Sequence, residues 1–244
     1  MISHKETIKT TMTSITLFLY ILFTGCANNQ SLSNSETAIY GELLKNFANS
    51  AQWKETIQKF KEDDQKNPPP QNAVLFVGSS SIVGWDTKKW FPDIKNINRG
   101  FGGSQINDSW YYAEDIIIPY HPKTIIFYAG DNDATIGQTP EMIFISFKAF
   151  AVKVRKALPK TKLIYISIKP SIARWAIWPK MQEANRLISN YCDKQKNMYF
   201  IDVSKVMLDA SGKPIEEIFS NDGLHMNEKG YQQWIPLVRS FIDK

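Results

Sequence analysis

The sequence predicts an α/β protein in which helices cover both faces of a parallel sheet. Continuous apolar runs of about five residues, typical of strands buried on both faces, recur along the 244-residue chain. Amphipathic stretches with helical spacing lie between them. Strands that alternate with helices in this way form parallel sheets with helices on both sides. The predicted strands are residues 73–77, 124–128, 163–167 and 198–202, with a shorter one at 94–98.

The composition is that of an ordinary globular protein, with 43% hydrophobic and 22% charged residues. Two cysteines exclude a disulfide-rich scaffold and argue against a zinc site built from several cysteines. The net charge of +5 permits weak attraction to nucleic acid or anionic lipid, but the lysines are spread along the chain. We therefore expect no nucleic-acid partner.

The first 25 residues have the pattern of a secretory signal. Lys5 and Lys9 precede an apolar run at 15–23, which is shorter than the roughly 20 residues that span a bilayer. Two small residues and then Cys26 follow, and this resembles the lipobox of bacterial lipoproteins, in which the cysteine is lipidated. An ordinary signal peptide with an incidental cysteine is the alternative. We expect an exported, lipid-anchored protein of the bacterial cell envelope, in the outer membrane if the cell is Gram-negative.

Residues 26–70 are predicted to form a polar tether and an N-terminal helical appendage. The polar run at 28–35 suits a tether, and apolar residues recur at helical spacing over 36–66. Three prolines at 68–70 end that pattern. Residues 71–244 are predicted to form one domain, without an internal repeat. Its longer predicted helices are 140–158, 179–194 and 227–242.

Polar motifs follow the first three predicted strands, where parallel sheets bind their ligands. The first is Gly-Ser-Ser-Ser at 78–81, and a serine beside a helix N-terminus lies near N–H groups that stabilise negative charge. The second is the glycine-rich run 98–104, whose glycines let a backbone N–H approach a ligand closely. The third is Gly-Asp-Asn-Asp at 130–133, whose asparagine is a candidate oxyanion donor. Taken singly, these motifs are also used as helix caps, tight loops and turns.

The fourth motif, Asp222-Gly-Leu-His225, contains the best candidate for a general base. Of the three histidines, His4 lies in the signal segment and His121 lies in a turn before a strand. An aspartate three residues before His225 is able to accept the Nδ1 proton and hold the tautomer that activates a serine. On its own such a motif is also compatible with a surface turn. The conjunction of all four motifs favours a catalytic site.

The order Ser, Gly, Asn, Asp-x-x-His resembles the SGNH/GDSL hydrolase superfamily over about residues 73–242. The resemblance implies a three-layer α/β/α sandwich with a flavodoxin-like, five-stranded parallel sheet. It also implies hydrolysis of esters or thioesters without a metal or other cofactor. Carried over by position, the nucleophile is Ser80, and Asp222 with His225 completes the triad.

The resemblance also implies an oxyanion hole formed by the backbone N–H groups of Ser80 and Gly103 and the side-chain amide of Asn132. One departure is Ser79, which stands where the family signature has aspartate. We expect Ser79 to cap the following helix and activity to survive. The Gly-Ser-Ser-Ser-Ile form resembles bacterial esterases of the platelet-activating-factor acetylhydrolase-like group and carbohydrate O-acetyl esterases.

We expect a serine esterase for short acyl esters, acetyl above all, of carbohydrates or small molecules, since the sequence contains no apolar lid segment. Residues 169–179 are predicted to select the substrate. Trp175 and Trp178 would stack on a sugar or line an acyl pocket, and Arg174 would meet an anionic group. In the alternative, both tryptophans only pack the loop onto the core. The alternative functions are a long-chain lipase or thioesterase of the same fold, and a non-catalytic glycan-binding envelope lipoprotein.

Overall fold

The computed structural model describes residues 31–45 and 47–242, and a five-stranded parallel sheet lies at its centre. The strand order β2-β1-β3-β4-β5 is the flavodoxin-like order, which confirms the predicted fold class. Every strand begins and ends within two residues of its predicted segment. The predicted signal segment and Cys26 lie outside the described residues. The strands are β1 Val74–Gly78, β2 Asn96–Gly100, β3 Thr124–Tyr128, β4 Lys162–Ile166 and β5 Met198–Ile201.

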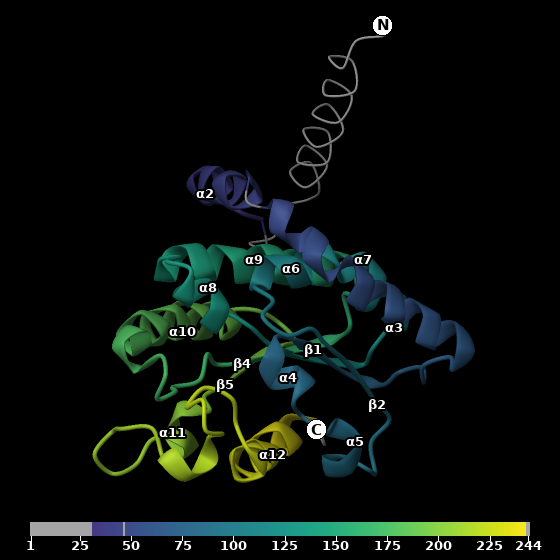
Figure 1. The fold of residues 1–244 in the computed structure, drawn as a ribbon. Helices are drawn as coiled ribbons and strands as arrows, with labels where there is room; N and C mark the ends of the chain where they lie inside the picture. The colour runs from purple at the N-terminus through teal and green to yellow at the C-terminus, as the bar shows by residue number, and fades with distance from the viewer. Residues whose placement is uncertain (1–30, 46, 243–244) are drawn as a thin grey trace, which may run out of the picture.

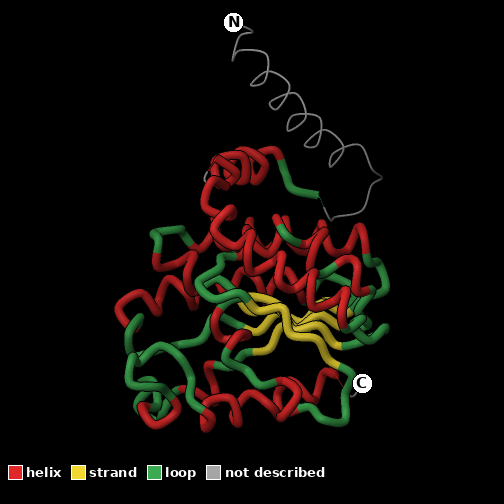
Figure 2. Tube along the Cα trace, turned by 45° about the vertical axis from the view of Figure 1, so that its right-hand side comes forward, coloured by secondary structure: helices red, strands yellow, loops and turns green. Residues whose placement is uncertain are grey.

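Helices cover both faces of the sheet (Figure 1). In the turned view of Figure 2, the strands lie between two helical layers. The three longer predicted helices form with their ends displaced by at most two residues, and short helices occupy the loops between them. One face is covered by α6 Ile106–Tyr111, α9 Pro140–Ala157 and α10 Trp178–Cys192, and the other by α5 Thr87–Trp90, α11 Ser204–Met207 and α12 Glu228–Ile242.

The apolar strands are buried because the core continues on both sides of the sheet. Neighbouring strand residues point to opposite faces. In β1, Leu75 belongs to a cluster that includes Phe150 of α9, and Phe76 belongs to a second cluster that includes Trp234 of α12. Burial of each such side chain stabilises the fold by roughly 1.5–3 kcal/mol. This is why strands 1 and 3 carry no polar alternation.

The N-terminal region differs from the single helical pattern predicted for residues 36–66. It divides into two helices separated by a 3-10 segment, in which Ser50 is buried. The Ser50 hydroxyl donates to Asp108 Oδ1 at 2.5 Å, and the Tyr112 hydroxyl donates to the Ser50 carbonyl at 2.6 Å. These contacts with the domain outweigh the local helical preference. The elements are α2 Asn34–Lys45, η1 Phe47–Trp53 and α3 Lys54–Lys66.

The first of these helices packs on the outer side of α9 (Figure 1), where Glu36 pairs with Lys148 at 2.7 Å. The α3 helix is joined to the edge strand β2 by an ion pair between Asp64 and Arg99. Within the described part of the chain, no helix is long and apolar enough to cross a membrane.

Candidate active site

Ser80 is the first residue of the short helix α4, Ser80–Val83, directly beyond the carboxyl end of β1. The turn between strand and helix requires a glycine at position 78. Gly78 has φ +136°, and a Cβ there would lie 1.8 Å from the carbonyl oxygen of Tyr128. The Ser79 N–H donates to the same oxygen at 2.9 Å. The chain therefore turns close against β3 and places a half-buried Ser80 at the end of the sheet.

Ser79 does not cap the helix as we expected. It occupies the N-cap position of α4, but its side chain makes no capping hydrogen bond. Its backbone is extended and bonded to β3, and its hydroxyl is buried with no partner among the described residues. The serine at this position thus faces the interior of the protein and does not turn toward the helix N-terminus.

The structure brings Ser80, Asp222 and His225 together. His225 Nε2 lies 3.0 Å from Ser80 Oγ, and His225 Nδ1 lies 2.6 Å from Asp222 Oδ2. The other carboxylate oxygen, Oδ1, accepts hydrogen bonds from the backbone N–H groups of Leu224 and His225, both at 2.9 Å. The side chains of Asp222 and His225 are nearly half exposed, so the line of three residues opens to solvent.

These hydrogen bonds hold the pKa of Asp222 well below its usual range. The bond with the His225 ring has the largest effect, followed by the two backbone N–H groups. Because an ionised carboxylate only accepts hydrogen bonds, it keeps the proton of a neutral imidazole on Nδ1. Nε2 then faces the Ser80 hydroxyl as an acceptor. This arrangement is able to take a proton from Ser80.

The other two predicted site residues, Gly103 and Asn132, come from the next two loops at the same edge of the sheet. Asn132 lies in α8, Asp131–Thr135, and its Nδ2 donates to the Ser104 carbonyl at 2.9 Å. Gly103 has φ +79°, and a Cβ on Gly102 would lie 3.7 Å from Ser80 Cβ. The glycine-rich segment 98–104, called the glycine loop below, therefore lies against Ser80 and is bonded to Asn132.

Trp53 of η1 also contacts the glycine loop, a contact that we did not predict from the sequence. A Cβ at Gly103 would lie 3.4 Å from the Trp53 indole, whose ring meets Phe101 edge-on at a centroid distance of 5.7 Å. The N-terminal region thus reaches the candidate site. No local signal in the sequence marks this contact, since it depends on how η1 packs.

The segment after β4 contains the residues predicted to select the substrate, and most of their contacts are with other residues of the protein. Arg174 donates to Asp131 Oδ2 at 2.7 Å and to Asn132 Oδ1 at 2.9 Å. Trp178 is the first residue of α10 and is buried in the core. Its ring stacks on that of Trp175, with a centroid distance of 6.3 Å and an interplanar angle of 16°. Trp175 is the partly accessible member of the pair.

Lys169, in the same segment, is a charged residue to which we assigned no role from the sequence. Only 2% of it is exposed, and its ammonium donates to the Leu224 carbonyl at 2.6 Å, within the loop that carries Asp222 and His225. Burial lowers the pKa of Lys169 to about 8, against the opposing effect of Asp131. The available signal was a lysine placed almost directly after an apolar strand.

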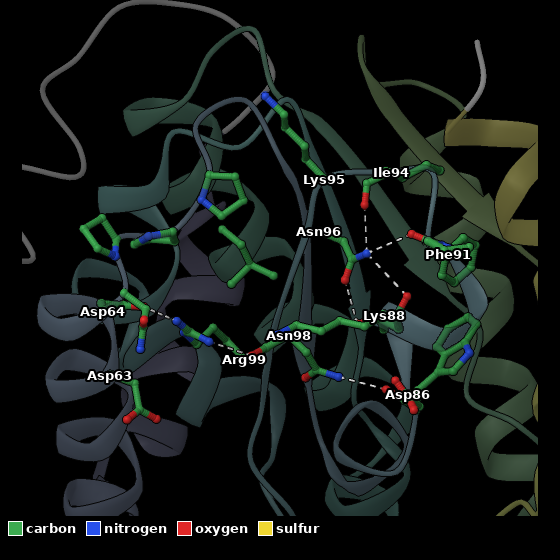
Figure 3. Close-up of a pocket in the computed structure, with 18 residues that line it drawn as sticks. Asp63, Asp64, Asp86, Lys88, Phe91, Ile94, Lys95, Asn96, Asn98 and Arg99 are labelled. Atoms are coloured by element: carbon green, nitrogen blue, oxygen red, sulfur yellow. Dashed lines mark hydrogen bonds and ion pairs between the residues drawn. The ribbon is translucent and has the colours of Figure 1, made fainter.

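A separate hollow of about 940 Å³ lies beside β2 and contains none of the triad (Figure 3). Several of its polar side chains are bonded to the protein itself. Asn96 donates to three backbone carbonyls and accepts from Thr87, and Arg99 is paired with Asp64. Among residues 31–45 and 47–242, no three His, Cys, Asp or Glu side chains are grouped so as to hold a metal ion. The candidate site is therefore the edge of the sheet around Ser80.

The comparisons with known proteins agree with this fold. A model of the GDSL-like lipase/acylhydrolase family matches residues 81–233, beginning one residue after Ser80. The sequence has no match among curated proteins.

Solved structures with the same fold include a Streptococcus pneumoniae protein that bears the name of platelet activating factor. It is 21% identical, with a TM-score of 0.70 over 84% of this chain and 99% of that one. A GDSL-like lipase from Bacteroides thetaiotaomicron is 21% identical, with a TM-score of 0.68; the match covers 77% of this chain and 97% of that one. A carbohydrate esterase of family 3 from Talaromyces cellulolyticus is 19% identical, with a TM-score of 0.56; the match covers 70% of this chain and 95% of that one.

Fold and family match together define an α/β enzyme that hydrolyses carboxylic esters. The chain belongs to the GDSL-like lipase/acylhydrolase family of the SGNH/GDSL superfamily. This confirms both the predicted superfamily and the prediction of an ester hydrolase.

Proposed function

We propose that the chain is a serine esterase in which Ser80 is the nucleophile, His225 the general base and Asp222 the residue that orients the base. The observation that carries the proposal is the unbroken line of hydrogen bonds from Asp222 Oδ2 through the His225 ring to Ser80 Oγ. A hydroxyl is a weak nucleophile by itself, and a base that is fixed in its tautomer makes it reactive.

In this mechanism, His225 takes the Ser80 proton as Oγ attacks the ester carbonyl carbon. The resulting oxyanion accepts hydrogen bonds from the backbone N–H groups of Ser80 and Gly103 and from the Asn132 amide. His225 then protonates the leaving alcohol, the bond between carbonyl carbon and alcohol oxygen breaks, and the acyl group remains on Ser80. Water, activated by His225, repeats the sequence, releases the acid and restores Ser80.

The nucleophile and the base are tested by separate substitutions at Ser80 and His225, with a control at the neighbouring Ser81. Ser80→Ala and His225→Ala are expected to abolish nearly all hydrolysis of p-nitrophenyl acetate, and Ser80→Ala to abolish labelling by a fluorophosphonate. Ser81→Ala is the matched control, because Ser81 is the next residue but is buried in α4, and it should keep both activity and labelling. Activity that survives Ser80→Ala and disappears in Ser81→Ala would assign the nucleophile to Ser81.

We propose short acyl esters, acetyl above all, of carbohydrates or small molecules as substrates. A long acyl chain needs a continuous apolar surface. Only five large hydrophobic side chains are exposed among the described residues, which are few to form such a surface. Similarity to a carbohydrate esterase supports a sugar as the alcohol component. Those exposed side chains are Val83, Tyr111, Ile136, Ile172 and Tyr199.

The acyl preference is measured with p-nitrophenyl esters from acetyl to palmitoyl, and acetyl release from acetylated glycans identifies the alcohol. We expect kcat/KM to fall as the acyl chain lengthens. A rise with chain length would replace the acetylesterase by the long-chain lipase or thioesterase.

We further propose that the enzyme is exported and attached to the bacterial cell envelope through lipid on Cys26. The support is the sequence pattern of residues 5–26, which lie outside the described residues. Full-length protein expressed in a bacterium should incorporate labelled palmitate and partition into detergent, and Cys26→Ser should do neither. Equal incorporation in Cys26→Ser would exclude a lipid anchor at this residue.

A further inference from the structure

Arg174 lies behind the candidate oxyanion donor in a largely buried position. Its side chain is 15% exposed, and that of its ion-pair partner Asp131 is 5% exposed. One guanidinium nitrogen donates to Asp131 at 2.7 Å, and the other terminal nitrogen donates to Asn132 Oδ1 at 2.9 Å. A planar guanidinium suits this task, since it holds two acceptors at once in a fixed geometry.

The contact with Arg174 decides which end of the Asn132 amide faces which way. An asparagine side chain has an accepting oxygen and a donating NH₂ group, whereas arginine only donates. The Asn132 oxygen must therefore face Arg174, and the NH₂ group must face the opposite side. There, one of its protons is donated to the Ser104 carbonyl of the glycine loop. Its second proton has no acceptor within the described part of the chain.

The segment that carries Arg174 is itself fixed to the loop of Asp222 and His225. The Ala173 N–H donates to the Gly223 carbonyl at 3.0 Å, and the Lys169 ammonium donates to the Leu224 carbonyl at 2.6 Å. The position of the guanidinium is thus fixed relative to the base, His225, as well as to Asn132.

We propose that Arg174 is a positioning residue that fixes Asn132 with its NH₂ group toward the oxyanion and, by its charge, polarises that group as a donor. The inference rests on the proposed function and replaces our expectation that Arg174 meets an anionic group of the substrate. Without Arg174, only the bond to the Ser104 carbonyl orients the amide. The amide would then rotate more readily, and its oxygen, once turned toward the oxyanion, would repel the developing negative charge.

The experiment is a double-mutant cycle on the neutral substrate p-nitrophenyl acetate, comparing wild type, Arg174→Gln, Asn132→Ala and the double variant. Arg174→Gln should lower kcat about ten- to a hundredfold, as expected for one charge-assisted hydrogen bond, with KM little changed. In the Asn132→Ala background, the same change should cost less than about twofold, because the side chain through which it acts is gone.

The variant Arg174→Lys tests whether the loss of kcat comes from misfolding. A lysine keeps the ion pair with buried Asp131, but its single nitrogen does not reproduce the fork to Asn132. It should fold normally and show a reduced kcat like that of Arg174→Gln. The matched control is Arg186→Lys in α10, since Arg186 pairs with Glu183 on its own helix and should leave kcat unchanged.

Three results would overturn the inference. Equal losses from Arg174→Gln in the presence and absence of the Asn132 amide would mean that Arg174 acts independently of Asn132. An unchanged kcat with neutral esters, together with a raised KM for anionic ones, would restore the role in substrate binding. An unchanged kcat in Asn132→Ala alone would refute the oxyanion role itself, so failure of the proposed function is visible in a separate arm.

Discussion

Two cations lie next to the catalytic loops: Lys169, which is buried, and Arg174, which is largely buried. Arg174 has a carboxylate partner, whereas the hydrogen bond found for the Lys169 ammonium runs to a backbone carbonyl. A charge in such a place costs free energy of folding unless it is well paired. We interpret both as residues that hold loops in place, because each bonds to a segment that carries a catalytic group.

The burial of Lys169 predicts a specific dependence of stability on pH. Its pKa is about 8 in the folded protein and near 10.5 when unfolded, so the unfolded chain binds more protons between these values. The free energy of unfolding should therefore rise with pH from about 8 to 10.5, relative to Lys169→Met, by on the order of 3 kcal/mol. The charged groups acting on Lys169 are Asp131, Arg174 and Asp222.

Urea unfolding of the wild type and Lys169→Met at pH 7, 9 and 10 measures this difference. The tyrosines and other titrating groups are present in both proteins, so their contributions cancel. A difference between the two proteins that does not change with pH would mean that folding does not lower the pKa of Lys169.

Among the elements, the turn from β1 into α4 is tightly constrained by its backbone. The strand ends in a residue with positive φ, the next residue bonds to β3, and the third is Ser80. The position of the nucleophile is thus set first by backbone packing between two strands, and side-chain bonds from Asn98 and Tyr231 to the α4 carbonyls hold the helix that follows.

Gly78→Ala should therefore prevent native folding. The added methyl group would lie 1.8 Å from a backbone oxygen of β3, which is unable to move without breaking the sheet. We expect a loss of more than about 4 kcal/mol in the free energy of unfolding, or insoluble protein. Gly137→Ala is the control, since Gly137 also has positive φ but no atom within 4 Å of the new Cβ. It should cost only about 1–2 kcal/mol, from strain alone.

On the scale of the whole molecule, the two apolar clusters on opposite faces of the sheet both stabilise the strands whose ends carry the site. Side chains alternate between them along β1 and β3, so opening one face exposes the sheet to water from that side. Cys192, at the end of α10, lies in one of these clusters and is 1% exposed.

Cys192 provides a probe of global unfolding. Burial raises the pKa of its thiol to about 12, so very little reactive thiolate is present in the folded protein. In a Cys26→Ser variant it is the sole thiol, and we expect no reaction with a thiol reagent at pH 8 until denaturant unfolds the chain. Labelling should follow the same denaturant curve as circular dichroism. Rapid labelling without denaturant would show that α10 opens locally.

Much of the fold was predictable because the relevant signals are local. The strands β1 and β3 are apolar on both faces, and their length and bounding residues mark them directly in the sequence. A helix after the first strand was predicted, but the other short helices at the strand ends and the break at η1 were not. Their local sequence signals are weak, and η1 is fixed by bonds from Ser50 to residues about 60 positions away.

For the site, the sequence by itself determined the chemical groups: a serine after a strand, a suitable histidine with an aspartate three residues earlier, and an asparagine at another strand end. Only the tertiary structure decided their surroundings. It directed Arg174 to Asn132, buried Lys169 and Trp178, and brought Trp53 against the glycine loop. The physical reason is range. Motifs record what a short segment is able to do, whereas burial and pairing depend on which distant segments pack against it.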